Sequence, residues 1–217
     1  MYNPRHFEEP RLDVIQGVIR ANPFGTLVTN GADGLIATHL PFLIDTTHPS
    51  GGEFGVLRGH MARANRQWRD FVDLEGETRD QALVIFQGPH AYISPSWYAA
   101  AEAVPTWNYV AVHAYGRPSI IEAPAAAFAL LRDLTANFEA PFEPPWTADG
   151  LSESYIESMV KAIVAFEIPI ARLEGKAKMS QNRPQDQVNV ADTLEASRDP
   201  MAIAVAGEIR DRVGAQG

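Results

Sequence analysis

The sequence predicts an α+β fold that consists mainly of antiparallel β-strands, closed into a small barrel and decorated with helices. Three observations predict this class. The chain begins with a short helical pattern and a meander of three strands, a later strand alternates strictly in polarity, and the second half is richer in helical patterns. Strands and helices do not alternate regularly along the chain, which excludes a doubly wound parallel sheet.

The first half of the chain combines strand patterns with two helical ones. Pro23 ends the first helix, because the residue before a proline avoids the α conformation. Met61, Ala64, Trp68 and Phe71 fall on one face of a second helix. The predicted elements are a helix over residues 11–22, strands over residues 24–29, 35–44 and 53–59, a helix over residues 61–71 and an acidic, solvated loop over residues 70–80.

Two more strands follow before the chain becomes mainly helical. Residues 82–86 form a buried strand that the sequence Gln87-Gly88-Pro89 is expected to break. In the strand over residues 104–115, the odd-numbered residues from Trp107 to Tyr115 point to one side of the sheet. The even-numbered residues Asn108, Val110, Val112 and Ala114 point to the other side. This alternation indicates a strand with one buried face.

Helices dominate the second half of the pattern, with one strand among them. Pro124 begins a helix with an apolar face of Phe128, Leu131, Leu134 and Phe138. The remaining predicted elements are a helix over residues 152–164 with Tyr155, Ile156, Met159, Val160 and Ile163 on its buried side, an edge or bulged strand over residues 166–173 that contains Pro169, and two C-terminal helices, the last capped by Asp199-Pro200.

No linker divides the 217 residues, so we expect a single domain over residues 1–217. Its barrel half and the helix after the third strand occupy about residues 1–122, and its helices, further strand and helical tail occupy about residues 123–217. Apolar runs are too short to cross a membrane, and the charged N-terminal residues leave no signal-peptide core. A cytoplasmic location without membrane contact is therefore expected.

Charge and cysteine content exclude several classes of function. The 18 basic and 27 acidic residues give a net charge of −9, which disfavours direct DNA binding and favours a small molecule as the bound anion. The segment from Asp133 to Glu157 contains six acids and no base. The absence of cysteine excludes disulfides, thiolate metal sites and thiol nucleophiles.

The most informative segment is Arg58 to Trp68, which joins the third strand to the helix predicted after it. A helix N-terminus attracts anions, and Arg63 in the first turn would add fixed donors to a phosphate, with His60 and Asn65 nearby. This pattern predicts a phosphate clamp. The alternative is an exposed basic helix start in which Arg66 pairs with Asp70.

Two further segments are candidates for ligand contacts. Lys176 to Arg183 is basic and contains two side-chain amides that can bind polar ring edges, although the sequence alone favours a polar loop between a strand and a helix. Residues 104–109 combine aromatic bulk with threonine and asparagine donors, which suits either a wall beside a planar ring or ordinary packing.

Motifs for other chemistry are missing from the sequence. The six histidines have no metal-ligand spacing, so no metal site is predicted, but one histidine suffices for haem ligation and that possibility stays open. Glycine-rich phosphate loops and a serine nucleophile motif are absent as well. The catalytic residues, if the chain is an enzyme, stay unassigned.

Taken together, these segments resemble the PaiB family of FMN-binding negative transcriptional regulators. The matching segments span nearly the whole chain in family order; they are Met1-Tyr2-Asn3-Pro4 with Phe7, Ala37-Thr38-His39-Leu40-Pro41, Gly59 to Asn65 with Gln67-Trp68, Phe86 to Tyr98, Val104 to Tyr109, and Lys178 with Ser180-Gln181-Asn182-Arg183. Met61 and Met179 stand where the family commonly has leucine.

The resemblance implies a split barrel like that of pyridoxamine phosphate oxidase, built as a homodimer with FMN at the subunit interface. It places the flavin ring beside Thr38, His39 and Leu40, and the ribityl phosphate beside His60, Ala62, Arg63 and Asn65. Contacts implied from the other subunit are Thr106, Trp107 and Asn108, or the segment that holds Lys178, Ser180, Gln181 and Asn182.

The resemblance also implies negative regulation of transcription, which we expect to be indirect or linked to the flavin state. No helix-turn-helix pattern is present, and the arginines that would have to hold DNA overlap with the predicted phosphate clamp. Three alternatives stay open: an FMN-dependent oxidoreductase that acts on a small molecule with NAD(P)H or oxygen, a haem-binding split barrel, and an interaction dimer that has lost its ligand.

Overall fold

The structure is a computed structural model, and it describes residues 1–31, 34–71, 82–99 and 102–214. The chain forms two compact units. The barrel unit comprises residues 22–86 and 114–173, and the terminal unit comprises residues 1–21, 87–113 and 174–217.

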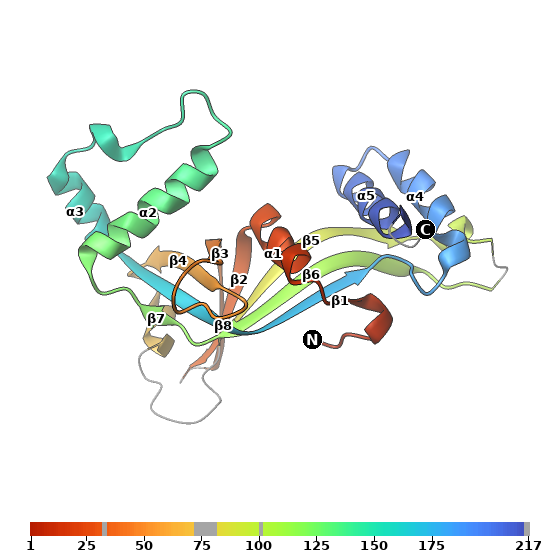
Figure 1. The fold of residues 1–217 in the computed structure, drawn as a ribbon, viewed down its shortest axis with the longest axis horizontal. Helices are drawn as coiled ribbons and strands as arrows, with labels where there is room; N and C mark the ends of the chain where they lie inside the picture. The colour runs from red at the N-terminus through yellow and green to blue at the C-terminus, as the bar shows by residue number, and fades with distance from the viewer. Residues whose placement is uncertain (32–33, 72–81, 100–101, 215–217) are drawn as a thin grey trace. The chain divides into compact units, whose positions relative to one another are not determined.

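The described residues form strands and helices in the order that Figure 1 shows. The strands are β1 (Glu8–Glu9), β2 (Phe24–Gly31), β3 (Gly34–Asp45), β4 (Val56–Ala62), β5 (Ala82–Ile93), β6 (Thr106–Gly116), β7 (Ser119–Ile120) and β8 (Ile163–Lys178). The α-helices are α1 (Leu12–Ala21), α2 (Pro124–Glu139), α3 (Glu153–Lys161), α4 (Gln187–Glu195) and α5 (Pro200–Gly214). Short 3-10 helices cover Arg5–Phe7, Arg66–Phe71, Pro95–Trp97, Ala148–Gly150 and Pro184–Asp186.

Strand pairing closes the sheet into a barrel. The strands lie in the order β1-β8-β4-β3-β2-β5-β6, with β7 beside β8, and a further pairing of β8 with β6 completes a ring. The pairs β2–β3, β2–β5, β3–β4 and β4–β8 are antiparallel. This ring is the antiparallel barrel that the meander predicts.

Three phenylalanines from three strands fill the interior of the barrel unit. The ring of Phe42 meets the rings of Phe86 and Phe166 edge to face, with centroids 5.7 Å and 6.2 Å apart. All three side chains are buried. Gly25 makes room for this cluster, because a Cβ atom there would lie 2.8 Å from the Phe86 ring. The aromatic cluster therefore fixes which face of each strand points inward.

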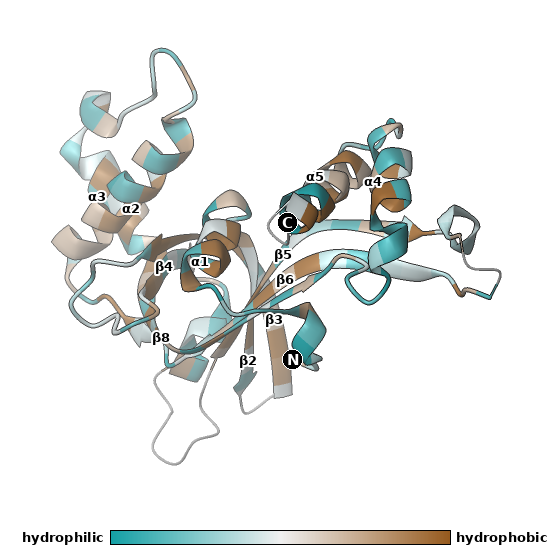
Figure 2. Ribbon diagram, turned by 45° about the vertical axis from the view of Figure 1, so that its right-hand side comes forward, coloured by the Kyte–Doolittle hydropathy of each residue, from teal (hydrophilic) through white to brown (hydrophobic). Residues whose placement is uncertain are grey.

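In the terminal unit, α4 and α5 pack through hydrophobic residues, which Figure 2 shows in brown. Their core includes Ile93, Val110, Met179, Val190, Leu194, Val205 and Ile209, all buried. The two C-terminal helices are predicted correctly, and so is the Asp199 cap, whose Oδ1 accepts a hydrogen bond from the Met201 amide over 2.9 Å.

The structure corrects the region after the third strand. That strand spans residues 56–62 instead of 53–59, and the predicted helix over residues 61–71 is wrong. Met61 is buried as an inward strand residue, and Ala62 still pairs with Ile163 of β8. The chain then turns, and only the 3-10 helix from Arg66 remains of the predicted helix. Strand pairing overrides the helical spacing here.

Two strand predictions are also corrected. β5 runs unbroken through Gln87-Gly88-Pro89, because Gly88 permits close approach to β6: a Cβ atom there would lie 3.0 Å from Cβ of Val110. β8 is twice the predicted length and is not an edge strand. Pro169 faces Val56 at the start of β4, and the adjacent Ile170 amide donates the hydrogen bond to Gly55.

The buried face of α2 differs from the predicted one by about one residue. Ala127, Leu130 and Leu134 pack with Ala165 of β8, so Phe128 and Leu131 lie on another side of the helix. α3 ends at Lys161 and has no buried residue, so its predicted buried side is wrong. The acidic loop falls almost wholly on residues 72–81, outside the described residues.

We predict that Gly116→Ala destabilises the barrel. A Cβ atom at Gly116 would lie 2.2 Å from the Pro169 carbonyl oxygen and 2.7 Å from Cγ2 of Ile168, so β6 and β8 would have to separate. We expect a loss of about 2 kcal/mol in the free energy of unfolding, measured by urea denaturation. Gly207→Ala in α5, where nothing lies within 4 Å, is the control and should retain or slightly raise stability. Equal stability of the two variants would contradict the close packing.

Candidate functional site

The predicted site residues fall into two clusters, one in each unit. The barrel cluster contains Thr38, His39, Leu40, His60, Ala62, Arg63 and Asn65, and the terminal cluster contains Thr106, Trp107, Asn108, Lys178, Ser180, Gln181 and Asn182. β3, β4 and the turn after β4 carry the first cluster. The start of β6, the end of β8 and the turn after it carry the second.

The turn after β4 is held by side-chain amides. The Nδ2 atom of Asn65 donates to Oγ1 of Thr38 over 3.0 Å, and its Oδ1 atom accepts from the Gln67 amide over 3.1 Å. Gln67 is buried, and its Nε2 atom donates to the carbonyl oxygens of Leu27 and Ile36. These bonds join the turn to β2 and β3, so Arg63 projects from a fixed backbone.

Arg63 occupies that turn and not the N-terminus of an α-helix. The predicted helix dipole is therefore missing from the phosphate clamp. The guanidinium is instead fixed by two backbone carbonyls, since Nε donates to Lys161 over 2.8 Å and Nη2 donates to Ile163 over 2.7 Å. The side chain is exposed and forms no ion pair with a described carboxylate. Its remaining N–H groups are available to an anion.

Alternation along β3 separates residues that are adjacent in sequence. Leu40 is buried in the barrel interior, while His39 is exposed on the outer face. Thr38 lies on the same side as Leu40 and holds Asn65. His39 stacks on the exposed Phe24 with ring centroids 6.1 Å apart and an interplanar angle of 28°. Of the three residues beside the expected flavin ring, only His39 presents its side chain on the outer surface.

His60 lies on the outer face of β4 with an unsatisfied nitrogen. Phe42 pairs with Gly59, so the next residues, Pro41 and His60, face outward together and line a cavity of about 340 Å³ with Leu134 and Phe138 of α2. Its Nδ1 atom is buried and has no hydrogen-bond partner among the described residues. Burial lowers the pKa of His60 below its ordinary value, because the charged ring would lose hydration.

The terminal cluster centres on two lysines of β8. Lys178 donates a short hydrogen bond to Oγ1 of Thr106, and Lys176 is buried with its Nζ atom 5.2 Å from the centroid of the Tyr109 ring. Neither ammonium has a carboxylate partner in the part of the chain that the structure describes. Burial and the charge of Lys176 lower the pKa of Lys178. The Lys176 ammonium donates to the Tyr2 carbonyl over 2.9 Å, and the positive charge of Lys178 favours a bound anion.

The turn after β8 is held in an unusual conformation. Ser180 has a φ of +59°, a left-handed conformation that is uncommon for serine. Its hydroxyl contacts the fully buried side chain of Asn108, whose Nδ2 atom donates over 3.0 Å. Gln181 accepts from the Met179 amide and donates to the Ala177 carbonyl, so it is a structural residue of this turn. Asn182 is exposed.

Trp107 is half-exposed beside the same strand. Its ring packs edge to face against Tyr92, with centroids 6.0 Å apart. The alternation predicted for β6 is confirmed, because Asn108, Val110 and Val112 are buried while Trp107 is not. The aromatic face thus lies outside the core, where it can contact a ligand or another chain.

The residues present fit FMN in three respects. An exposed, anchored arginine can bind the phosphate, the stacked pair of Phe24 and His39 offers a flat surface to a planar ring, and Nδ1 of His60 has no partner among the residues that the structure describes. Sequence reasoning missed Phe24 and Pro41. The two-residue alternation of β2 and β3 contains the signal that would place both on the outer face with His39.

Comparisons with known proteins identify the family of the chain. The family model described as "Putative FMN-binding domain" matches residues 1–172. Protease synthase and sporulation protein PAI 2 from Bacillus subtilis (strain 168) is 38% identical over 217 residues, covering 100% of both chains.

Solved structures show the same fold at low sequence identity. The flavocytochrome Anf3 from Azotobacter vinelandii has a TM-score of 0.58 at 13% identity, covering 80% of this chain and 71% of that chain. The FAD and haem binding protein from Mycobacterium smegmatis has a TM-score of 0.57 at 14% identity, covering 79% and 73%. The predicted α+β split-barrel class is confirmed. No helix in the described residues is long and apolar enough to cross a membrane.

The lowered pKa of His60 predicts a pH-dependent stability. Below the ordinary histidine pKa, the unfolded chain binds a proton more readily than the folded chain, so stability falls as the pH falls until the folded pKa is passed. We expect His60→Gln to lose less unfolding free energy than the wild type between about pH 7.5 and about pH 5.5. Urea denaturation at both values measures this difference, and equal losses would contradict the buried, uncharged ring.

Proposed function

This chain belongs to the family of FMN-binding domains, with FMN as its cofactor, and from this premise we propose that it is a flavoprotein of the PaiB type that regulates transcription negatively through its flavin-bound state. The observation that carries the proposal is the anchored guanidinium of Arg63. Its two bonds to backbone carbonyls fix its orientation, and the side chain is exposed in the turn after β4.

In the proposed site, each group of this chain has a separate task. Arg63 binds the phosphate, while Phe24 and His39 support the ring from the outer face of the barrel. Bound FMN would supply reversible electron transfer. The uncharged ring of His60 offers a hydrogen-bonding nitrogen beside the same strands without adding a charge.

The terminal cluster supplies the second half of the proposed site from another copy of the chain. Lys178 carries a positive charge without a described counter-ion, and Trp107 offers an exposed ring. Both features suit contact with an anionic, aromatic cofactor. A homodimer with FMN between the barrel cluster of one subunit and the terminal cluster of the other uses both sets of residues.

Regulation by direct DNA contact is disfavoured by the state of the arginines. Arg58, one of four candidates for a basic patch, is paired with Asp133 over 3.1 Å and is largely buried. Arg63 is assigned to the FMN phosphate in this proposal, which leaves Arg66 and Arg69 as exposed cations in this stretch. A chain with a net charge of −9 needs a denser patch to hold phosphates of DNA. The proposed regulation is therefore indirect.

A flavin-dependent oxidoreductase is the second candidate, and the cavity between His60 and α2 favours it. This cavity of about 340 Å³ gives a small substrate room beside the strands that face the flavin. Anaerobic bleaching of bound FMN by NADPH, followed by turnover with an acceptor, would favour this candidate. A visible absorption spectrum of the purified protein tests haem binding, because bound haem gives a Soret band.

We expect Arg63→Ala to weaken FMN binding about ten- to a hundredfold, because a charge-assisted pair with the phosphate is lost. Quenching of FMN fluorescence during titration of the purified protein measures the dissociation constant. Arg66→Ala is the matched control, since Arg66 is an exposed cation at the start of the 3-10 helix after this turn and has no anchoring contact with the described residues. Equal affinities of wild type and Arg63→Ala would contradict the assignment of the phosphate.

Mixing two variants that each bind FMN weakly tests whether the site is shared between two subunits. If each site combines clusters of two subunits, a heterodimer of Arg63→Ala and Lys178→Ala has one site in which both clusters are intact. We expect each variant alone to bind FMN weakly and the co-refolded mixture to regain tight binding at about one quarter of its sites. No recovery in a mixture that contains the heterodimer would place both clusters in sites of a single subunit.

A further inference from the structure

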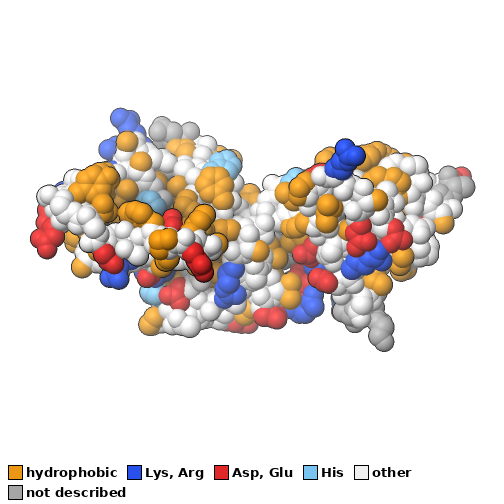
Figure 3. Space-filling view, turned by 90° about the horizontal axis from the view of Figure 1, so that it is seen from above, with side chains coloured by type: hydrophobic (Ala, Val, Ile, Leu, Met, Phe, Trp, Pro, Cys, Tyr) orange, Lys and Arg blue, Asp and Glu red, His pale blue; other side chains and the backbone are white. Residues whose placement is uncertain are grey.

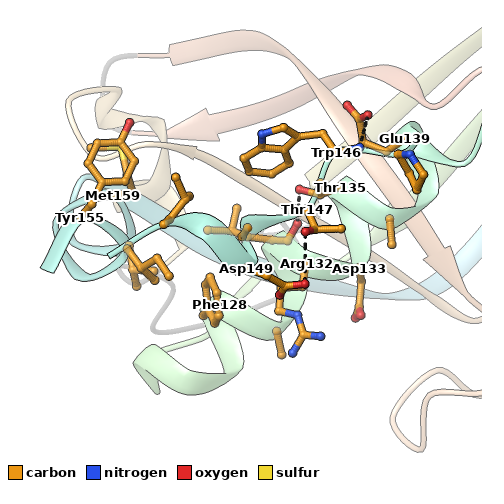
Figure 4. Close-up of a pocket in the computed structure, with 18 of the residues that line it drawn as sticks. Phe128, Arg132, Asp133, Thr135, Glu139, Trp146, Thr147, Asp149, Tyr155 and Met159 are labelled. Carbon is orange, nitrogen blue, oxygen red and sulfur yellow. Dashed lines mark hydrogen bonds between the residues drawn. The ribbon is translucent and has the colours of Figure 1, made fainter. Parts of the chain in front are cut away.

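The loop and helices between residues 124 and 161 line a cavity that is open to solvent on one side and shares Leu131, Thr135, Glu139 and Trp146 with the smaller cavity beside His60. It has a volume of about 770 Å³ and lies between α2, α3 and the loop that joins them (Figure 4). This volume is typical of small-molecule sites, which span roughly 300–1,000 Å³. The cavity belongs wholly to the barrel unit.

Apolar and aromatic side chains that form no part of the barrel core line this cavity. Trp146 is 51% exposed, Tyr155 is 50% exposed and Met159 is 43% exposed. α3 carries the periodic apolar face of a buried helix, although none of its residues is buried. Val160 packs partly buried against the core cluster of α2, while Tyr155 and Met159 stay exposed at the cavity, where a ligand would shield them from water.

Polar bonds hold the walls of the cavity in place. Oε2 of Glu139 accepts from the Trp146 amide over 3.0 Å, which ties the end of the loop to α2. Oδ2 of Asp149 accepts from the Thr147 hydroxyl over 3.1 Å. Both carboxylates bond only to neutral donors in the described structure, so each keeps its charge uncompensated by an ion pair.

The charge of the lining favours a cation. Among the charged residues of the lining, Asp133 is paired with Arg58. The remaining charges are the carboxylates of Glu139 and Asp149 and the guanidinium of Arg132. The surrounding segment, from Asp133 to Glu157, has six acids and no base. In Figure 3, acidic and hydrophobic side chains are interspersed at the left, over α2 and α3. A low-dielectric hollow among like charges concentrates ions of the opposite sign.

We propose that the cavity between α2 and α3 binds an organic cation with an apolar body. The rings of Trp146 and Tyr155 would face the cation and its hydrocarbon, since aromatic faces attract positive charge. Glu139 and Asp149 supply the preference for a cation over a neutral or anionic molecule of equal size. This site goes beyond the proposed flavin function and does not require FMN.

A pair of ions with the same shape and opposite charge tests the proposal. Tetraphenylphosphonium and tetraphenylborate are titrated into the full-length protein, with and without FMN, and binding is measured by calorimetry. We expect saturable binding of tetraphenylphosphonium, at least about fivefold tighter than that of tetraphenylborate. Equal or tighter binding of the anion, or no saturable binding of the cation, would overturn the proposal.

Four variants locate the binding site. Glu139→Gln with Asp149→Asn keeps both acceptor oxygens and should abolish the preference for the cation. Trp146→Ala should weaken binding of the cation, and Tyr155→Ala replaces it if that variant fails to fold. Asp13→Asn, which removes one exposed acid of the terminal unit, should bind as the wild type does. Unchanged binding of the cation in both the Glu139→Gln/Asp149→Asn variant and the aromatic variant (Trp146→Ala or its replacement Tyr155→Ala) would also overturn the proposal.

Discussion

The aromatic cluster of Phe42, Phe86 and Phe166 is the constraint on which the candidate flavin site depends. Edge-to-face packing of these rings fixes Phe42 toward the barrel interior. Side chains alternate along a strand, so His39 and Pro41 must then point outward, and pairing with β4 brings His60 to the same face. A shift of one residue in β3 would bury His39 and expose the core. The core thus positions candidate site residues that it does not contact.

Much of this arrangement could be predicted from the sequence. Turn residues and alternating polarity indicated the meander and β6, and proline and aspartate marked the starts of α2 and α5. The helix expected at Arg63 was wrong, because spacing alone cannot distinguish inward strand residues such as Met61 from one face of a helix. Only pairing with a distant strand, β8, decides between them.

For the same reason, the contacts within the two clusters could not be predicted from the sequence. Arg63 is anchored by carbonyls about a hundred residues away, and Asn108 supports Ser180 from another strand. Local patterns carry no information on such partners. The residue types were nevertheless informative, since a motif that combines arginine, asparagine and glutamine proved to be a turn held by its own amides.

The α3 helix contributes less to the stability of the fold than the barrel strands do. None of its residues is fully buried, and Val160 packs partly buried against the core cluster of α2, so substitutions at its exposed positions remove little of the packing that keeps the chain folded. Related chains can therefore diverge in this helix and its preceding loop while the barrel stays the same. Over evolution, α3 and the loop before it are free to acquire new ligand selectivity. Natural selection would then act on this segment through the ligand that it recognises rather than through folding.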